Sequence, residues 1–166
     1  GLAQQGHQEI QTLPLADGGE GTFELLMQQH EGMRVAASVH DPLLRPLQAT
    51  YGISKDGTTA FMEMASASGL ALLASHERNP LLTSSVGTGE LIAHALDQGV
   101  QHIVLGIGGS ATNDAGTGLA SALGIRFLDA QGATITPSGG NLVKIAAIDN
   151  SARHPRLAQT KITVLC

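Results

Sequence analysis

The spacing of hydrophobic and polar residues predicts β-strands in the first part of the chain. Alternation over 35–39 is typical of a strand with one buried face, and the run 9–16 predicts another strand. Two β-prone runs, 48–54 and 58–64, flank the pair Asp56-Gly57. Because Asp-Gly is a strong signal for a tight turn, we expect these two runs to form an antiparallel hairpin.

Helical periodicity, with apolar residues three and four positions apart, predicts helices further along the chain. The hydroxyl of Thr22 is suited to cap the first of them, and Gly99 and Gly124 follow the last residues of two others. The predicted helices are 22–29, 67–74, 88–98 and 112–123.

The second half of the chain contains a continuous apolar run, 102–107, of the kind found in strands buried in a parallel sheet. Together with the helix 112–123 and a short strand over 125–128, it predicts a βαβ unit with parallel strands. Since the hairpin adds antiparallel strands, the expected fold class is α/β with a mixed sheet. A turn-rich segment, 130–158, leads to a last strand over 161–165.

Composition narrows the class of protein. The 166 residues are close to one domain at roughly 150 residues per domain, and 42% hydrophobic with 14% charged residues excludes an intrinsically disordered chain. A net charge of -5 with 9 Lys and Arg, and only 2% aromatic residues, argues against nucleic acid or an anionic membrane as partner. One cysteine, no apolar run of about 18 residues and no basic leader favour a cytoplasmic protein without internal disulfides.

Glycine is unusually frequent, with 21 residues, or about 13% of the chain where about 7% is usual. The glycines gather at 18–21, 87–89 and 106–118, each time where an apolar run passes into a predicted helix. Glycines at such turns allow backbone N–H groups to approach an anionic ligand closely. These turns are therefore candidate binding sites.

The turn over 17–22 reads Asp-Gly-Gly-Glu-Gly-Thr and places two carboxylates three positions apart. Mg²⁺ prefers oxygen ligands and is typically held by one or two carboxylates together with phosphate and water. Asp17 and Glu20 are therefore candidate catalytic residues or magnesium ligands, with Gly18 and Gly19 beside the bound group. The alternative is a glycine turn with a charged surface, in which Asp17 favours the start of the next helix.

A second glycine turn, over 108–114, reads Gly-Gly-Ser-Ala-Thr-Asn-Asp. A turn that enters a helix offers free backbone N–H groups, and hydroxyl and amide side chains add donors for a phosphate or carboxylate. Asp114, in the first turn of the predicted helix, suits a metal ion or a base better than a pyrophosphate. The alternative is close helix packing, for which Gly116 and Gly118 would serve. The candidate donors are Gly108, Gly109, Ser110, Ala111, Thr112 and Asn113.

The same segment also fits a dinucleotide-binding fingerprint. Gly106, Gly108 and Ala111 match G-x-G-x-x-A, and Asp129 ends the next predicted strand, where such proteins place a ribose-binding acid. A nucleotide- or dinucleotide-binding module without catalysis is therefore the alternative function. The acidic pair at 17 and 20, which such a module does not need, favours an enzyme.

Two further charged residues are functional candidates. Arg78, one of 9 cationic residues, lies in a polar loop, and arginine matches a carboxylate or phosphate with two parallel hydrogen bonds. Arg78 is therefore a candidate for substrate binding, with a solvated side chain as the alternative. Glu63 stands at the end of an apolar strand, where a charge is unexpected.

Five segments of the chain form a recognisable set. They read PLADGGEGT at 14–22, ASASGLAL at 65–72, ERNPL at 77–81, GTGELI at 87–92 and GIGGSATNDAG at 106–116. In this order they closely resemble the bacterial glycerate kinase family, of the type that makes 2-phosphoglycerate from D-glycerate and ATP. The resemblance covers nearly the whole chain, and the first and last segments are the most specific.

The resemblance implies the two-domain architecture of type I glycerate kinases, with a Rossmann-like domain, a mixed-sheet domain and the site between them. Residues 1–40 would then be part of the Rossmann-like domain, and 41–166 a mixed α/β domain that is incomplete at its C-terminus. Members of the family are more than twice as long as this chain. It is therefore expected to be an internal fragment that is inactive by itself.

The resemblance also implies roles for the candidate residues. ATP and Mg²⁺ are the expected cofactors, and glycerate is the expected small-molecule partner. Asp17 and Glu20 would act near Mg²⁺ or the acceptor hydroxyl, and Asp114 would act as a base or further carboxylate. The turn 108–113 would hold an anionic group, and Arg78 would hold the glycerate carboxylate.

Overall fold

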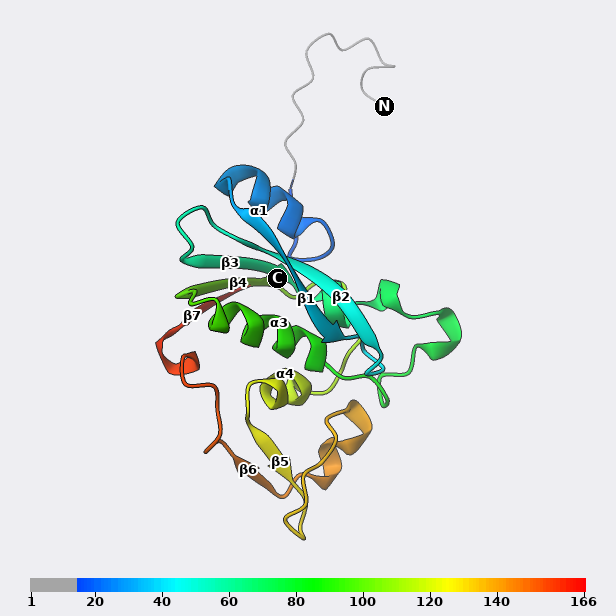
Figure 1. Cartoon of the computed structure of the whole chain (residues 1–166). Coiled ribbons are helices and arrows are strands. Elements are labelled where there is room, and N and C mark those ends of the chain that lie inside the picture. The colour runs from blue at the N-terminus through cyan, green and yellow to red at the C-terminus, as the bar shows by residue number, and fades with distance from the viewer. Residues whose placement is uncertain (1–14) are drawn as a thin grey trace.

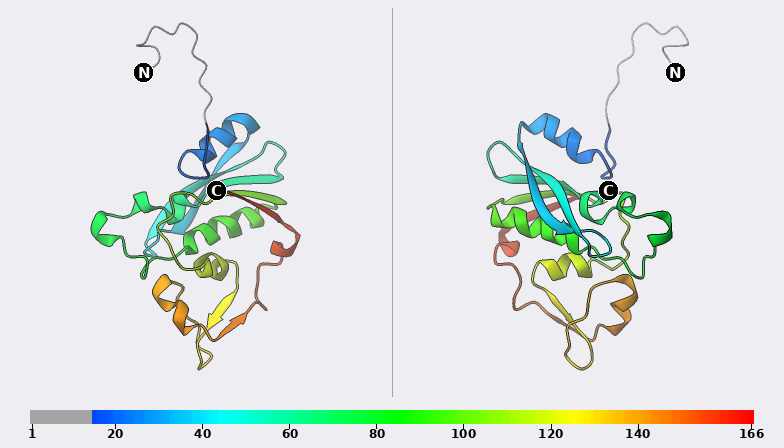
Figure 2. Two further views of the ribbon diagram at one scale, coloured as in Figure 1. Left: turned by 180° about the vertical axis from the view of Figure 1, so that it is seen from behind. Right: turned by 45° about the vertical axis from the view of Figure 1, so that its right-hand side comes forward.

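The computed structural model describes residues 15–166, in which a central sheet lies between layers of helices (Figure 1). Helix α1 (Thr22–His30) covers one face of the sheet, and α3 (Val86–Asp97) covers the other. Helix α4 (Thr117–Ala122) packs on the outer side of α3. Figure 2 shows the same order of layers from two other directions, with the small pair β5 (Arg126–Leu128) and β6 (Ala147–Asp149) far from α1.

Within the described residues the main sheet has five strands in the order β1-β2-β3-β4-β7. β1 (Met33–His40) runs antiparallel to β2 (Pro46–Ile53), and β2 runs antiparallel to β3 (Thr59–Glu63). β4 (His102–Gly106) lies parallel to β3 on one side and to β7 (Lys161–Leu165) on the other. The structure therefore confirms the mixed sheet, the hairpin around Asp56-Gly57 and the strands predicted over 35–39, 102–107 and 161–165.

The βαβ unit predicted over 102–128 is wrong. β5 lies outside the main sheet and pairs antiparallel with β6. The parallel neighbours of β4 are instead β3 and β7, so the parallel part of the sheet forms from strands farther apart in the sequence. Helix α4, which was expected over 112–123, begins only at Thr117 and packs on α3.

Backbone conformation explains why two predicted helices are shorter than expected. Ala115 and Gly116 have φ angles of 51° and 72°, in the left-handed region, so α4 cannot extend back through them. Gly69 is extended and ends α2 (Ala65–Ser68), after which a 3-10 turn forms over Leu70–Leu72. The single helix predicted over 67–74 is therefore two short turns. The helices predicted over 22–29 and 88–98 are confirmed as α1 and α3.

The hydrophobic core has two parts, one on each face of the sheet. Met62 of β3 belongs to the larger cluster on the α3 side, and its neighbour Phe61 belongs to the smaller cluster under α1, as alternation along a strand requires. Burial on both faces anchors the carboxyl-terminal part of β3, and the carboxyl ends of β3 and β4 carry the loops described below. The larger cluster also contains Tyr51, Leu91, Leu96 and Ile103, and the smaller one Phe23 and Met27.

The domain division expected at residue 40 falls between β1 and β2, which pair with each other along the whole of β1. The strands on both sides of this position belong to one sheet, and the division into two domains stays a prediction. The strand predicted over 9–16 falls mainly outside the described residues. In the part of the chain that the structure describes, no helix is long and apolar enough to cross a membrane.

Asp149, in β6, has a carboxyl group whose titration can test the contacts around it. Hydrogen bonds from the side chain and the backbone N–H of Ser151, and then from Arg126, lower the pKa of Asp149 from 3.8 to about 2. Because the folded-state pKa is lowered, these contacts stabilise the fold above pH 3.8 and are lost as the pH falls through about 2. An NMR titration of the Asp149 carboxyl carbon is expected to show a midpoint near 2. A midpoint at the ordinary value would show that the contacts to Ser151 and Arg126 do not form in solution.

Candidate functional site

Two glycine loops meet at the carboxyl ends of the parallel strands. β3 ends at Glu63, β4 at Gly106 and β7 at Leu165, and these three residues lie side by side in the sheet. The loop 107–116 leaves β4 at this edge, and the loop 17–21 lies against it. In open α/β sheets this edge is where ligands bind.

The contact between the two loops depends on glycine. The N–H of Gly108 donates to the carbonyl oxygen of Gly18 at 2.9 Å. A Cβ on Gly108 would lie 2.6 Å from the Cα of Gly19, and a Cβ on Gly106 would lie 2.4 Å from the carbonyl oxygen of Gly18. Any side chain at these positions would therefore push the loops apart. The turn 106–110 follows the carboxyl end of β4 as predicted, whereas the strand expected before the loop 17–21 lies outside the described residues.

The two carboxylates of the loop 17–21 are both exposed. The N–H of Gly19 donates to Oδ1 of Asp17 at 3.0 Å, so Asp17 shapes the turn as well as carrying charge. Glu20 has no hydrogen-bond partner among residues 15–166, and its Oε1 atom lies 4.0 Å from the position that a Cβ on Gly109 would take. The structure therefore places a free carboxylate beside the second glycine turn.

Helix α1 begins without the cap that its sequence predicted. Gly21, with a φ of 91°, takes the N-cap position, and the predicted cap Thr22 is the first residue of the helix. The side-chain oxygen of Thr22 is buried without a hydrogen-bond partner within the described residues. The free N–H groups of the first turn instead face a carboxylate from the sheet, that of Glu63.

Glu63 is buried at the end of β3, with 7% of its surface exposed. Its Oε1 atom accepts a hydrogen bond from the N–H of Phe23 at 2.6 Å, and the backbone N–H of Gly21 also lowers the pKa of the carboxyl group. Burial raises the pKa of Glu63, these two N–H groups lower it, and the carboxylates of Glu20 and Glu24 raise it further. The unexpected charge at the end of an apolar strand was the sequence signal for this residue.

Several hydrogen-bond donors of the turn 108–113 are already bonded within the protein. The N–H of Ala111 donates to the carbonyl oxygen of Ser68 at 2.8 Å, as that of Gly108 does to Gly18. The hydroxyl groups of Ser110 and Thr112 lie 2.9 Å apart, and the N–H of Thr112 donates to Oγ of Ser110 at 3.1 Å. Within residues 15–166 the N–H groups of Gly109, Ser110 and Asn113 have no partner, so these three remain available to a ligand.

Asp114 is buried and does not lie in a helical turn. Its carboxyl oxygens accept hydrogen bonds from the N–H and hydroxyl groups of Ser85 and from the N–H groups of Gly116 and Gly118. The carboxyl group thereby joins the start of α3 to the start of α4. The geometry gives Asp114 a role in holding the loop 107–116, and its assignment as a base stays a prediction. In the sequence, the hydroxyl residues 83–85 indicate a polar loop before a helix, but nothing there indicates that Ser85 pairs with Asp114.

Arg78 is exposed in the segment that leads from the 3-10 turn Ser75–Glu77 to α3. It forms no ion pair within the described residues; the neighbouring Glu77 pairs with Arg45. The next part of this segment reaches the second glycine loop, because a Cβ on Gly139 would lie within 3.0 Å of the carbonyl oxygens of both Pro80 and Asn113. Pro80, two positions after Arg78, is therefore close to the end of the loop 107–116, and Arg78 itself is exposed and free to bind an anion.

The dinucleotide fingerprint has no structural basis in this fold. Asp129 follows β5, which lies outside the main sheet, and its carboxylate accepts the N–H groups of Gln131 and Ala133 in a turn. The ribose-binding acid of such proteins instead ends a strand adjacent to the glycine turn in a parallel sheet. The alternative function built on this match is therefore not favoured.

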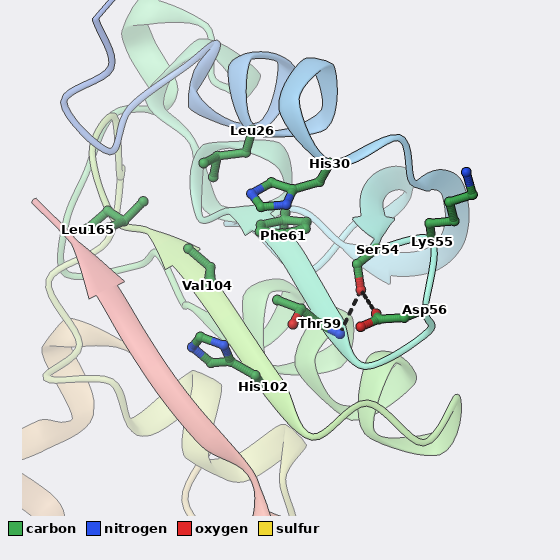
Figure 3. Close-up of a pocket in the computed structure, with 10 residues that line it drawn as sticks. All are labelled: Leu26, His30, Ser54, Lys55, Asp56, Thr59, Phe61, His102, Val104 and Leu165. Carbon is green, nitrogen blue, oxygen red and sulfur yellow. Dashed lines mark hydrogen bonds between the residues drawn. The ribbon is translucent and has the colours of Figure 1, made fainter.

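Hollows of about 570 and 400 Å³ flank the loop 17–21, one beside Gly21 and Glu63 and the other beside Asp17 and Leu165. A third hollow, of about 560 Å³, lies under α1 on the open face of β3 and β4 (Figure 3). There the ring of His30 stacks on Phe61 with centroids 4.6 Å apart. None of the predicted site residues lines this third hollow, so we place the candidate site at the loops.

Among residues 15–166 no group of three or more His, Cys, Asp or Glu side chains is close enough to hold a metal ion by itself. Asp17 and Glu20 could still bind Mg²⁺ together with groups that the protein does not supply. This ion is usually bound by one or two carboxylates, with substrate phosphates and water completing its ligands. Two exposed carboxylates beside an anion-binding turn have the donor chemistry for that arrangement.

Comparison with known proteins matches residues 1–166 to a family described as the "Glycerate kinase family". The chain is 51% identical to the "Glycerate kinase" of Bacillus cereus, over 95% of this chain and 42% of that protein. It is 49% identical to the "Glycerate 2-kinase" of Escherichia coli, over 93% of this chain and 41% of that protein. The crystal structure of a putative glycerate kinase 2 from Salmonella typhimurium LT2 superposes with a TM-score of 0.88 at 52% identity, over 93% of this chain and 42% of that one. The chain spans about two fifths of the length of these relatives.

Proposed function

The chain belongs to the glycerate kinase family, and on that premise we propose that it forms part of an enzyme that phosphorylates D-glycerate to 2-phosphoglycerate with ATP. The observation that carries the proposal is the meeting of two glycine loops at one edge of the sheet. One loop carries two exposed carboxylates and the other offers free N–H groups. Phosphoryl transfer depends mainly on positioning the phosphate and neutralising its charge, and these groups suit both tasks.

The acidic loop would bind the metal and orient the acceptor. Asp17 and Glu20 would hold Mg²⁺, which supplies charge neutralisation on the phosphates when it is bound. The same carboxylates lie where they can orient the hydroxyl group that receives the phosphoryl group. Gly18 and Gly19 keep this loop close to the second glycine turn.

The second turn would bind the anionic groups. The N–H groups of Gly109 and Ser110, with the side chains of Thr112 and Asn113, would donate to a phosphate. Gly108 would set the turn through its bond to Gly18. Arg78 would hold the carboxylate of glycerate, which a guanidinium group matches with two parallel hydrogen bonds.

We extend the proposal to the architecture. Residues 1–40 would contribute to a Rossmann-like domain, 41–166 to a mixed α/β domain, and the substrate would lie between the two. We also propose a cytoplasmic location, where ATP is available to the enzyme. Phosphate transfer between two small molecules requires no nucleic acid and no membrane.

The experiment is a coupled assay of ADP release by the full-length protein that contains this chain. With Mg·ATP and D-glycerate, turnover on the order of 1–100 s⁻¹ is expected, as for other kinases. A thermal-shift measurement separates the alternative function. Stabilisation by Mg·ATP or glycerate supports the kinase, whereas stabilisation by NAD(H) alone, without ADP release, would support a dinucleotide-binding module.

A further inference from the structure

We propose that Glu63 is the positioning residue of the acidic loop 17–21, holding the start of α1 so that Asp17 and Glu20 face the second glycine turn. The proposal deepens the kinase assignment and rests on it for its kinetic test. Its structural test, described below, is independent of that assignment. The argument combines the place of Glu63 in the sheet, its hydrogen bonds and the way in which the loop is fixed at both ends.

Glu63 lies where β3 opens into the site. It pairs in register with Gly106 of β4, and the N–H of the next residue, Met64, donates to the carbonyl oxygen of Gly106 at 2.7 Å. The side chain points to the α1 face of the sheet, because it follows Phe61 at the two-residue period of a strand. The carboxylate is therefore held by a rigid strand directly beneath the first turn of α1.

The carboxylate replaces the cap that α1 lacks. No side chain at the N-cap position of α1 accepts a hydrogen bond. Instead Oε1 of Glu63 accepts a hydrogen bond from the N–H of Phe23, in the first turn of the helix, at 2.6 Å. A carboxylate at the start of a helix also interacts favourably with the helix dipole. Glu63 thus fixes α1 at the residues that directly follow the acidic loop.

The backbone of the loop is consequently held on both sides of Glu20, whose side chain has no hydrogen-bond partner within residues 15–166. At its first end the carbonyl oxygen of Gly18 accepts the N–H of Gly108 at 2.9 Å. After its second end, Phe23 is held by Glu63. Glu20 lies between these two points, and no other contact within residues 15–166 fixes its side chain. The backbone that follows Glu20 is therefore anchored to β3 through Phe23 and Glu63, and this contact limits where the Glu20 carboxylate can lie.

The electrostatic cost of Glu63 supports a specific role. Burial raises the pKa of Glu63, and the nearby carboxylates of Glu20 and Glu24 raise it further, so this position is unfavourable for a charge. The backbone N–H groups of Phe23 and Gly21 act in the opposite direction. An apolar residue would pack at the end of β3 without this cost, but it would leave the N–H of Phe23 without its acceptor.

The structural test is amide hydrogen exchange at Gly21 and Phe23 in the full-length protein, with Glu63→Ala and Glu63→Gln compared with wild type. Glu63→Ala removes the acceptor, and exchange at Phe23 is expected to become faster on the order of tenfold or more. Glu63→Gln keeps an oxygen at the same position and is expected to lie between Glu63→Ala and wild type. The matched control is Glu90→Ala, because Glu90 accepts the N–H of His40 at 2.7 Å on the other side of the molecule. Glu90→Ala should leave exchange at Gly21 and Phe23 unchanged.

The kinetic test separates positioning from direct catalysis. Positioning predicts a fall in kcat on the order of tenfold or more for Glu63→Ala, with partial recovery in Glu63→Gln. Equal losses in both variants would overturn the proposal, because a residue that acts on the substrate through its charge gains nothing from glutamine. Unchanged exchange in Glu63→Ala would also overturn it. If the wild-type protein releases no ADP with glycerate, the kinase assignment fails, and the exchange measurement alone decides the role of Glu63.

Discussion

Replacing Glu20 by glutamine is expected to lower kcat of the full-length enzyme on the order of 100-fold or more while its stability is unchanged. The side chain is exposed, and within the described residues it makes no hydrogen bond that glutamine would lose. Its oxygen lies 4.0 Å from the place where a Cβ on Gly109 would stand, beside the N–H groups proposed to bind phosphate. The loss of activity would therefore come from the missing carboxylate. Steady-state kinetics and thermal unfolding of the same samples measure the two effects.

Asp17→Asn is the companion variant. Asparagine keeps the side-chain oxygen that accepts the N–H of Gly19 at 3.0 Å, so the turn is preserved while the charge is removed. A fall in kcat comparable with that of Glu20→Gln is expected. Asp17→Ala would also lose the turn and is therefore less informative.

Glu31→Gln is the matched control for both variants. Glu31 is an exposed acid at the opposite end of α1, where it pairs with the equally exposed Lys55. Its replacement removes one negative charge at the far end of α1 without touching the loops, and kcat is expected to stay at the wild-type value. Unchanged turnover in Glu20→Gln and Asp17→Asn would show that neither carboxylate takes part in catalysis. The loop would then be a glycine turn with a charged surface, which is the alternative that the sequence left open.

The strands were predictable wherever local pattern and turn chemistry agreed. Asp56-Gly57 specifies a tight turn, and the runs beside it pair as β2 and β3. The βαβ unit was not predictable, because the apolar positions of α4 suit a sheet and a neighbouring helix equally well. The structure packs α4 on α3, where a Cβ on Gly89 would lie 2.3 Å from the carbonyl oxygen of Leu119. That close approach is a tertiary contact, and a pattern along one segment does not reveal its partner.

The loops of the site were predictable from the sequence, but the residues that hold these loops in place were not. Glycine clusters indicated that 17–21 and 106–110 form turns, and the structure brings the two turns together through Gly18 and Gly108. The acceptor for the first turn of α1 comes from Glu63, forty positions away from Phe23. The partner of Asp114 is Ser85, at a separation of 29 positions. Such pairings depend on how strands and helices stack, so spacing within a motif does not reveal them.

Asp114→Ala is expected to destabilise the protein by about 3–5 kcal/mol, the largest effect on stability among the variants considered. The substitution removes the acceptor of the N–H and hydroxyl groups of Ser85 and of the N–H groups of Gly116 and Gly118. Asp114 is only 2% exposed, so water cannot readily replace the lost oxygens. Each buried donor left without a partner costs about 1–3 kcal/mol, reduced where the structure relaxes.

Asp56→Ala is the matched control for burial. Asp56 also accepts hydrogen bonds from a backbone N–H and from hydroxyl groups, those of Thr58 and Ser54, but it lies in the exposed hairpin turn. Water can solvate these donors when the carboxylate is removed, so a much smaller loss of stability is expected. The comparison therefore isolates the contribution of burial from that of hydrogen-bond number.

Amide hydrogen exchange in α3 is the measurement for Asp114, because it reports the free energy of opening in this part of the protein. Asp114→Asn should lie between alanine and wild type, since its one remaining oxygen accepts part of the hydrogen-bond set. Ser85→Ala should be milder than Asp114→Ala, because it leaves the N–H groups of Ser85, Gly116 and Gly118 bonded to the carboxyl group. If Asp114 instead acts as the base, Asp114→Asn would abolish turnover with exchange in α3 at the wild-type rate. That result would show that Asp114 acts as a catalytic base and is not needed to hold the loop 107–116.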